Sequence, residues 1–396
     1  MNKEYFEFVC PVKMVAGFRA LEHIPFELDT RGSVRPMIVS DKGVVGAGLV
    51  DIVVQAITSE GGKVGPVFDN VPPDSSMDSV NAGAAIYLES DCDAIIAVGG
   101  GSVMDTAKAM NIMATEGGGD PRRYAGYNNL KHRLKPYIAV PTTAGTGSEV
   151  TAISVIKDTD AGMKTFYFSQ FLLPDVAVLD PRMTLKLPPM ITAATAMDAM
   201  THAVEAFTCL AKNPLSDAYA EAAIRRISEW LVPVLQKPDD PRGRLELAQA
   251  AAMAGIAFSN SPVGLVHALA HTIGAMYGVH HGAANSIFLP YVLEFNLPAS
   301  RAEIGELLFH LAGPEDFAGT PVERRAEAAI ARIVEMKEAA HAICGLPRTL
   351  SETGKIPRED LPGIAEKSLD DGTVVMNPVD VTYEDALAVL ERAWGD

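Results

Sequence analysis

The strongest constraint on the fold is a change of hydrophobic pattern about halfway along the 396-residue chain. In the first half, short apolar runs rich in β-branched residues are bounded by Gly, Pro or Asp, which is typical of buried strands. These runs lie at residues 36–41, 94–98, 137–141 and 176–180. Because stretches of helical spacing such as residues 46–60 separate them, we expect an α/β domain with a largely parallel sheet.

After Pro188-Pro189 the apolar residues recur every three or four positions, and strand candidates become rare. This spacing predicts an all-helical domain. Its expected helices lie at residues 191–210, 215–235, 245–258 and 324–340, with a last helix within residues 377–394 that Thr382 caps. Asp-Pro and Pro-Pro pairs punctuate the chain between the two patterns. We therefore expect an α/β domain over residues 1–185 and an all-helical domain over residues 186–396.

Composition limits the partners and the compartment. With 33 Lys and Arg against 50 Asp and Glu, the net charge is -17, which disfavours nucleic acid and anionic lipid surfaces as partners. No export signal is visible at the N-terminus, and no apolar stretch approaches the roughly 18–20 residues that cross a bilayer. The four cysteines are scattered without a CxxC pair, which suits a reducing compartment. We expect a cytoplasmic protein.

A glycine-rich segment follows the second expected strand. Residues 98–105 read Val-Gly-Gly-Gly-Ser-Val-Met-Asp and open an expected helix over residues 103–114. Glycines let the backbone approach a ligand, and a helix N-terminus attracts phosphate. The spacing is not GxGxxG, because Met104 stands where the third glycine would be, and a tight strand–helix turn explains the same residues. The hydroxyl of Ser102 and the carboxylate of Asp105 favour the phosphate interpretation modestly.

A second loop of small residues, Pro-Thr-Thr-Ala-Gly-Thr-Gly-Ser-Glu at residues 141–149, follows the third expected strand. In isolation it fits an exposed turn equally well, but two such loops at one sheet edge point to a ligand, because α/β proteins bind ligands there. Asp41 ends the first strand, where a carboxylate can accept hydrogen bonds from a ribose diol and repel a 2′-phosphate. That position favours NAD over NADP, although such aspartates are often plain turn residues.

Three polar residues share one face of an otherwise apolar stretch in the helical half. Asp198, His202 and Glu205 lie at positions i, i+4 and i+7, one above another on the expected helix. Burying them is costly unless a partner pairs them. A divalent metal ion would do so, and so would an internal Asp–His hydrogen bond.

Further histidines follow, and five of the nine in the chain lie between residues 202 and 281. His267 and His271 share a helix face, and His280-His281 come shortly after. Residue 268 is Ala, so the sequence lacks the HExxH motif of metalloproteases. One carboxylate with three imidazoles suits Fe(II) or Zn(II), and the absence of thiolates argues against a structural zinc site. The combined pattern predicts a metal site.

Several long motifs, in order, resemble those of the iron-containing (group III) alcohol dehydrogenases. The resemblance covers nearly the whole chain and is carried by GGGSVMDTAK, PTTAGTGSEVT, LPDVAVLDPRMTLKLPP, DAMTHAVEA, GLVHALAHTIGAMYGVHHGAAN and NPVDVTYEDA. It implies the dehydroquinate synthase-like fold, in which an N-terminal α/β dinucleotide-binding domain precedes an all-helical domain and the active site lies between them. Two segments depart from the family pattern: Val379 follows Asn-Pro where Arg is usual, and Asp74-Ser75 replace Asn and Pro.

The resemblance also implies roles for individual residues. The metal ligands would be Asp198, His202, His267 and His281. His271 would face the nicotinamide and substrate, and His280 would be structural. The implied NAD contacts are Asp41, Gly100, Gly101, Ser102, Asp105, Thr142, Thr143, Ser148 and Lys164. Phe258 would line the substrate pocket, and the apolar positions Phe258 and Ile153 favour aliphatic or otherwise uncharged substrates.

We therefore expect reversible hydride transfer between NAD(H) and a primary alcohol/aldehyde pair, with Fe(2+), or alternatively Zn(2+), as a Lewis acid on the substrate oxygen. His271 would relay the proton. A homo-oligomer, dimer or larger, follows from the family resemblance. Two alternatives remain: a polyol dehydrogenase or another dehydroquinate synthase-like enzyme, which commonly has fewer histidine ligands, and a non-catalytic nucleotide-binding protein, which needs no oxygen-polarising ion.

Overall fold

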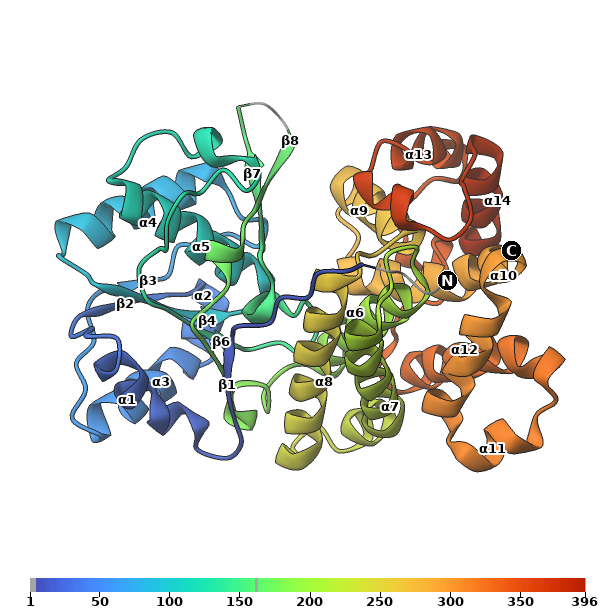
Figure 1. Cartoon of the computed structure of the whole chain (residues 1–396), viewed down its shortest axis with the longest axis horizontal. Coiled ribbons are helices and arrows are strands. Elements are labelled where there is room, and N and C mark those ends of the chain that lie inside the picture. Colours follow the sequence, from blue (N-terminus) through green and yellow to red (C-terminus); the bar gives the residue numbers. More distant parts are fainter. Residues whose placement is uncertain (1–4, 161–162, 396) are drawn as a thin grey trace. The chain divides into compact units, whose positions relative to one another are not determined.

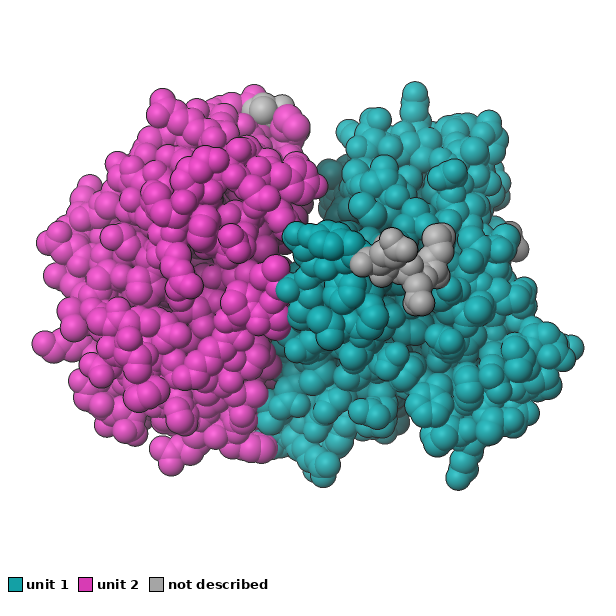
Figure 2. Space-filling model, in the orientation of Figure 1, with its two compact units in different colours: residues 1–8, 187–396 teal, residues 9–186 magenta. Residues whose placement is uncertain are grey.

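The computed structural model describes residues 5–160 and 163–395, and Figure 1 traces their helices and strands along the chain. The chain forms two compact units, which Figure 2 distinguishes by colour. Unit 2 comprises Val9–Lys186. Unit 1 comprises Leu187–Asp396 together with the N-terminal residues up to Phe8.

Unit 2 contains a six-stranded sheet in which every neighbouring pair of strands is parallel. The strand order is β1-β9-β6-β4-β2-β3. The strands span Lys13–Ala16 (β1), Pro36–Val39 (β2), Val67–Phe68 (β3), Ala94–Gly99 (β4), Tyr137–Pro141 (β6) and Val176–Leu179 (β9). The four strands predicted from the sequence are the four interior ones. Because every residue of these four strands is buried, they appear in the sequence as continuous apolar runs.

Helices cover both faces of this sheet, and each face has its own apolar core. Along β4, Ile95 and Ala97 join one core while Ile96 and Val98 join the other, as the alternation of strand side chains requires. The first core contains α4 (Met77–Glu89) and α5 (Gly101–Glu116), and the second contains α1 (Ile24–Asp29) and α3 (Leu49–Ser59). The α3 helix starts later than the predicted residue 46, because Gly48 is in the left-handed conformation with φ 75°.

A second, small sheet in unit 2 was not predicted from the sequence. It has the order β5-β8-β7, with bounds Gly126–Tyr127 (β5), Ile153–Asp158 (β7) and Met163–Phe168 (β8). The β7 and β8 strands are antiparallel, and their residues alternate between buried and exposed only in part. Short, partly exposed strands of this kind lack the continuous apolar run that revealed the main sheet.

Unit 1 is helical, and its described residues form no strand. Its helices are α6 (Pro189–Thr208), α7 (Pro214–Gln236), α8 (Pro241–Asn260), α9 (Leu265–Tyr277), α10 (His281–Ala312), α11 (Pro314–Gly319), α12 (Arg325–Cys344), α13 (Leu361–Ser368) and α14 (Tyr383–Trp394). The predicted α/β plus all-α fold class is therefore confirmed. The last helix, predicted within residues 377–394, spans Tyr383–Trp394, and Thr382 caps it as the sequence predicted, in a capping box with Asp385.

The α6 helix is central to unit 1, and α7, α8 and α10 pack against it. Every α6 residue from Thr192 to Thr208 is buried, so its polar side chains lie in the interior. Among the described residues, no single helix has both the length and the apolar character to cross a membrane, although α8 and α9, bent by 106°, would have both if taken together.

Candidate metal centre and nucleotide-binding loops

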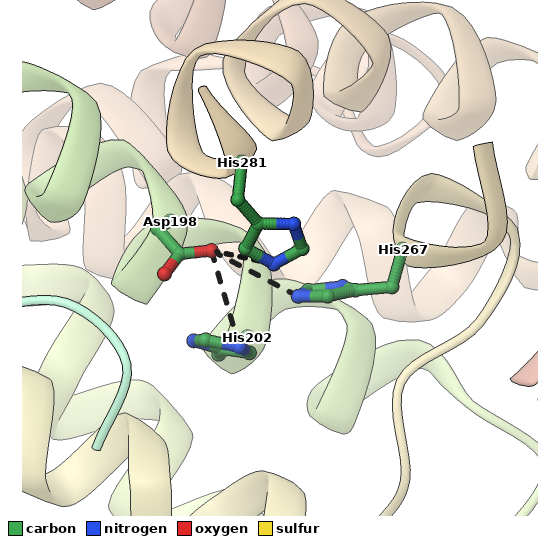
Figure 3. Close-up of side chains that lie close together, drawn as sticks. All are labelled: Asp198, His202, His267 and His281. Carbon is green, nitrogen blue, oxygen red and sulfur yellow. Dashed lines mark ion pairs between the residues drawn. The ribbon is translucent and has the colours of Figure 1, made fainter. Parts of the chain in front are cut away.

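Four side chains from three helices converge in unit 1. Asp198 and His202 come from α6, His267 from α9, and His281 is the first residue of α10 (Figure 3). One donor atom from each lies within 4.8 Å of those of the other three. The Nε2 atoms of His202, His267 and His281 lie 4.0, 3.9 and 3.5 Å from Oδ1 of Asp198.

Local sequence explains why these helices meet. Asp198 and His202 are one helical turn apart and therefore project from the same face of α6. Gly278 ends α9 in the left-handed conformation with φ 63°, and α10 begins three residues later. Gly282 lies directly against α6, since a Cβ atom there would be 2.1 Å from the backbone oxygen of Ala194. A glycine at this position thus lets the start of α10 bring His281 next to Asp198.

Burial and neighbouring charges set the protonation states. Burial alone would raise the pKa of Asp198, but nearby His202 and His281 and a hydrogen bond from Asn285 keep it below the ordinary value. Burial lowers the pKa of His267 well below its ordinary value and that of His281 to about 4. These shifts favour an ionised carboxylate beside neutral imidazoles at neutral pH, which are the forms that bind a divalent cation.

The donor set fits a cation. The amide nitrogen of the fully buried Asn285 lies 2.6 Å from Oδ1 of Asp198 and 3.2 Å from Nε2 of both His267 and His281. Three of the four donor atoms therefore face one electropositive group. One carboxylate oxygen with three imidazole nitrogens is a set that suits Fe(II) or Zn(II).

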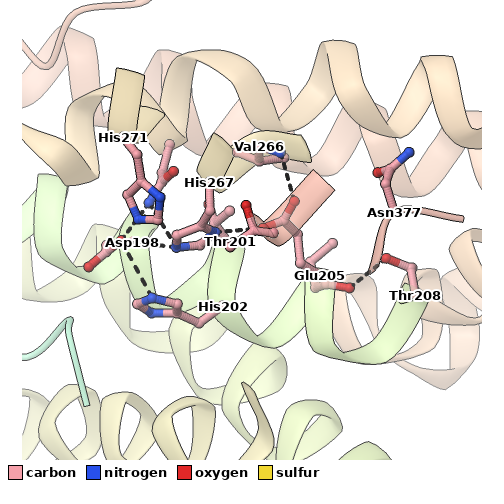
Figure 4. Close-up of polar contacts among 12 residues, drawn as sticks. Asp198, Thr201, His202, Glu205, Thr208, Val266, His267, His271 and Asn377 are labelled. Carbon is pink, nitrogen blue, oxygen red and sulfur yellow. Dashed lines mark hydrogen bonds and ion pairs between the residues drawn. The ribbon is translucent and has the colours of Figure 1, made fainter. Parts of the chain in front are cut away.

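Two carboxylates contact ring nitrogens of histidines in this region, and Figure 4 shows one of them, Glu205, beside His267. Glu205 lies 2.5 Å from Nδ1 of His267, and Asp371 lies 2.8 Å from Nδ1 of His271. Burial raises the pKa of Glu205 to about 8, against the effect of three backbone N–H groups that favour its ionised form. Burial also acts to raise the pKa of Asp371. The hydrogen bond from His271 outweighs this effect and holds the pKa of Asp371 well below its ordinary value.

The remaining predicted residues of unit 1 lie beside the four donors. The His271 ring stacks nearly parallel to that of His281 at 5.2 Å, and the Phe258 ring stacks on His202 at 4.2 Å. His280 is exposed and precedes α10 as its N-cap residue. Sequence reasoning missed Asn285 and Asp371 and gave Glu205 no role. Only Glu205 carried a signal, its helical spacing from Asp198 and His202.

In unit 2 the two predicted loops touch. Gly100 and Gly101 open α5 after β4, and the second loop follows β6. A Cβ atom on Gly101 would lie 3.0 Å from Cγ2 of Thr146, and one on Gly100 would lie 3.3 Å from Oγ1 of Thr143. The N-cap residue of α5 is Gly100, which has no side chain to cap the helix. Close glycine backbone and an uncapped helix N-terminus form a suitable cradle for a phosphate group.

Several predicted cofactor residues already make contacts within unit 2. Asp41 caps α2 (Lys42–Gly46) by accepting from the Val44 N–H at 2.9 Å. Ser102 donates to the Pro73 backbone oxygen at 2.5 Å, and Lys164 forms an exposed ion pair with Asp74 at 3.1 Å. The backbone N–H of Thr142 donates to the oxygen of Gly99, at the end of β4. Ile153 begins β7 and is half-buried.

Asp105 and Ser148 are hydrogen-bonded to each other, and a buried lysine that sequence reasoning missed contacts Ser148. Ser148 donates to Asp105 at 2.9 Å, and Nζ of Lys108 lies 3.1 Å from the same hydroxyl. Lys108 also donates to the backbone oxygens of Thr151 and Ile153. Burial lowers the pKa of Lys108 to about 8 and raises that of nearby Glu149 to about 7. This network ties α5 to the second loop.

Comparisons with known proteins agree with this architecture. The family described as iron-containing alcohol dehydrogenase matches residues 11–181, and the C-terminal part of the Fe-containing alcohol dehydrogenase family matches residues 192–394. The chain belongs to the iron-containing alcohol dehydrogenase family. The chain is 34% identical to the NAD-dependent methanol dehydrogenase of Bacillus methanolicus over 98% of its length and 99% of that protein's.

Other members of the family are similarly close. The chain is 35% identical to the 1,3-propanediol dehydrogenase of Klebsiella pneumoniae over the full length of both chains. The crystal structure of a 1,3-propanediol oxidoreductase superposes with a TM-score of 0.93 at 34% identity, covering 98% of this chain and 100% of the other. These findings confirm the predicted family, the oxidoreductase class acting on alcohols, and iron and NAD as cofactors. They argue against the non-catalytic alternative.

Proposed function

We propose that this alcohol dehydrogenase interconverts a primary alcohol and its aldehyde at a metal centre held by Asp198, His202, His267 and His281. The observation that carries this proposal is the convergence of four donor atoms within 4.8 Å of one another. When bound, the cation supplies Lewis-acid activation of the substrate oxygen, and the nicotinamide of NAD supplies hydride transfer.

His271 is the proposed proton carrier. An ionised Asp371 accepts the Nδ1–H of this imidazole at 2.8 Å, which leaves Nε2 as the nitrogen that takes up a proton from the substrate hydroxyl. The His271 side chain is 43% exposed, so the proton can pass on to water. The four donor residues need no such exit, because they hold the cation and do not exchange protons during turnover.

We assign Phe258 and Ile153 to the substrate pocket. The aromatic ring of Phe258 covers one face of the His202 imidazole and gives the donor group an apolar neighbour. An apolar wall disfavours a charged substrate group, since burying a charge without a partner is costly. The preferred substrates are therefore aliphatic or otherwise uncharged alcohols and aldehydes.

We assign NAD binding to residues 1–185 and metal binding to residues 186–396. The proposed cofactor contacts are Asp41, Gly100, Gly101, Ser102, Asp105, Thr142, Thr143, Ser148 and Lys164. The carboxylate of Asp41 favours NAD over NADP. We also infer a cytoplasmic protein, because the dispersed cysteines suit a reducing compartment, and a homo-oligomer, a dimer or larger, from the family resemblance.

A substrate panel tests the proposal. NADH oxidation is followed by absorbance after reconstitution with Fe(II), using short aldehydes and, for each length, an analogue that ends in a carboxylate. We expect turnover of the uncharged aldehydes, little turnover of the charged analogues, and loss of both after treatment with a chelator. Full activity after verified removal of the metal would contradict the proposed role of the donor group.

A further inference from the structure

Glu205 contacts a proposed metal ligand without belonging to the donor group. It lies on α6, seven residues after Asp198, and is only 6% exposed. Its Oε2 lies 2.5 Å from Nδ1 of His267, and its Oε1 accepts the backbone N–H of Val266 at 2.8 Å. One carboxylate thus contacts both the side chain and the backbone of α9.

The second of these contacts replaces a missing helix cap. The N-cap residue of α9 is Gly264, which has no side chain to satisfy the first N–H groups of the helix. Glu205 supplies an acceptor from α6 instead, and a Cβ atom on Gly264 would lie 3.4 Å from its Oε1. The helix dipole and the backbone N–H groups favour the ionised form of Glu205, which opposes the rise in its pKa that burial causes.

The first contact decides which nitrogen of His267 carries the proton. A neutral imidazole has one N–H, and the hydrogen bond at one nitrogen fixes the state of the other. On the opposite side of the ring, Nε2 lies 3.2 Å from the amide nitrogen of Asn285, which can only donate, so this contact favours Nε2 as the acceptor. The proton is then on Nδ1, where Glu205 accepts it, and the lone pair on Nε2 points to the donor group.

We propose that Glu205 is a positioning residue of the metal centre, which holds His267 in the Nδ1–H form and fixes the start of α9, and thereby sets cation affinity without binding the cation. This inference rests on the proposed ligand set. Partners of this kind behind a ligand histidine typically change metal affinity by about 10–100-fold when mutated.

Metal affinity tests the inference directly. The dissociation constant for Zn(II) is measured by competition with a chromophoric chelator for wild type, Glu205→Gln and Glu205→Leu. We expect both variants to bind about 10–100-fold more weakly. Asp371→Asn is the matched control, because it alters a carboxylate–imidazole pair on a histidine outside the donor group, and we expect its Zn(II) affinity to match wild type. Unchanged affinity in both Glu205 variants, with only a lower melting temperature of the metal-free protein, would overturn the inference.

Two further measurements separate the possible failures. If His267→Ala retains wild-type Zn(II) affinity, the proposed ligand set itself is wrong. If His267→Ala loses Zn(II) affinity while both Glu205 variants keep it, only the inference about Glu205 is overturned. If the Glu205 variants do not fold, 15N-histidine NMR of the Zn(II)-loaded wild type decides, with the His267 signals assigned by their absence in His267→Ala. We expect the His267 proton on Nδ1 with a bond to an acceptor. An Nε2–H form, or an Nδ1–H exposed to water, would contradict it.

Discussion

In unit 2 most of the candidate cofactor residues lie just after the ends of parallel strands, whereas in unit 1 the candidate ligands project from helices. The loops at Gly100–Gly101 and Thr142–Thr143 offer backbone N–H groups, hydroxyls and space. The helices offer side chains. Asp198 and His202 project from one face of α6, and α9 and α10 each contribute one histidine. Nucleotide binding should therefore depend on backbone geometry, and metal binding on side-chain identity. Substitutions can separate the two.

The largest expected effect is in the helical unit. His267→Ala removes one of four donor atoms, so we expect loss of bound metal and a fall in kcat/KM of about 1,000-fold or more, which corresponds to about 4 kcal/mol of Lewis-acid stabilisation. Metal content and steady-state kinetics check this. His280→Ala is the control, because this exposed neighbour of His281 lies outside the donor group, and it should retain metal. Normal metal content in His267→Ala would contradict the claim that metal binding in unit 1 depends on the identity of these side chains.

Removal of the metal tests, without a mutation, whether metal binding and nucleotide binding are separate. After chelation we expect no turnover but NADH binding within about threefold of the untreated protein, a difference below 1 kcal/mol. The melting temperature should fall, because a cation at 1,000 times its dissociation constant stabilises the folded state by about 4 kcal/mol. NADH fluorescence titration and thermal unfolding check these outcomes. Loss of NADH binding together with the metal would show that the two regions do not act separately.

A substitution in the glycine-rich loop of unit 2 should weaken NADH binding and leave metal binding intact. Gly101→Val places a Cβ atom 3.0 Å from Thr146 and crowds the two loops. Overpacking of this size costs about 1–3 kcal/mol, so we expect NADH affinity to weaken about tenfold or more. Metal content should stay normal. Gly46→Ala is the matched control, since a Cβ atom there meets nothing within 4 Å, and it should bind NADH normally.

The last prediction concerns stability alone and the buried lysine of unit 2. Burial lowers the pKa of Lys108 from 10.5 to about 8. Between these pH values the folded state binds fewer protons than the unfolded state, so Lys108 makes stability rise with pH by up to about 1.4 kcal/mol per pH unit. Urea unfolding should therefore show wild type gaining stability over Lys108→Met from pH 8 to 10. A constant difference throughout would mean that Lys108 titrates normally.

The sequence predicted those features that repeat at short range. The interior strands were visible because each is a continuous apolar run, and Asp198 and His202 were visible because one helical turn separates them. The cap at Thr382 was equally local. The edge strands and the small sheet were not predicted, since strands such as β3 have two residues and no distinctive pattern.

Contacts between distant segments could not be predicted from spacing. Asp371 lies 100 residues from His271, and Glu205 lies 62 residues from His267. Lys108 looked like an ordinary helical residue until its partners at Thr151 and Ile153 were known. Their pairing depends on how helices and loops pack, and no periodicity within one segment encodes that.

X-ray absorption spectroscopy of the Zn(II)-loaded protein tests the central claim most directly. One carboxylate and three imidazoles predict a first shell of nitrogen and oxygen at about 2.0–2.2 Å. The spectrum should also show the outer-shell scattering of three histidine rings, reduced to two in His267→Ala. A shell containing sulfur, or scattering from fewer than three imidazoles in wild type, would contradict the account.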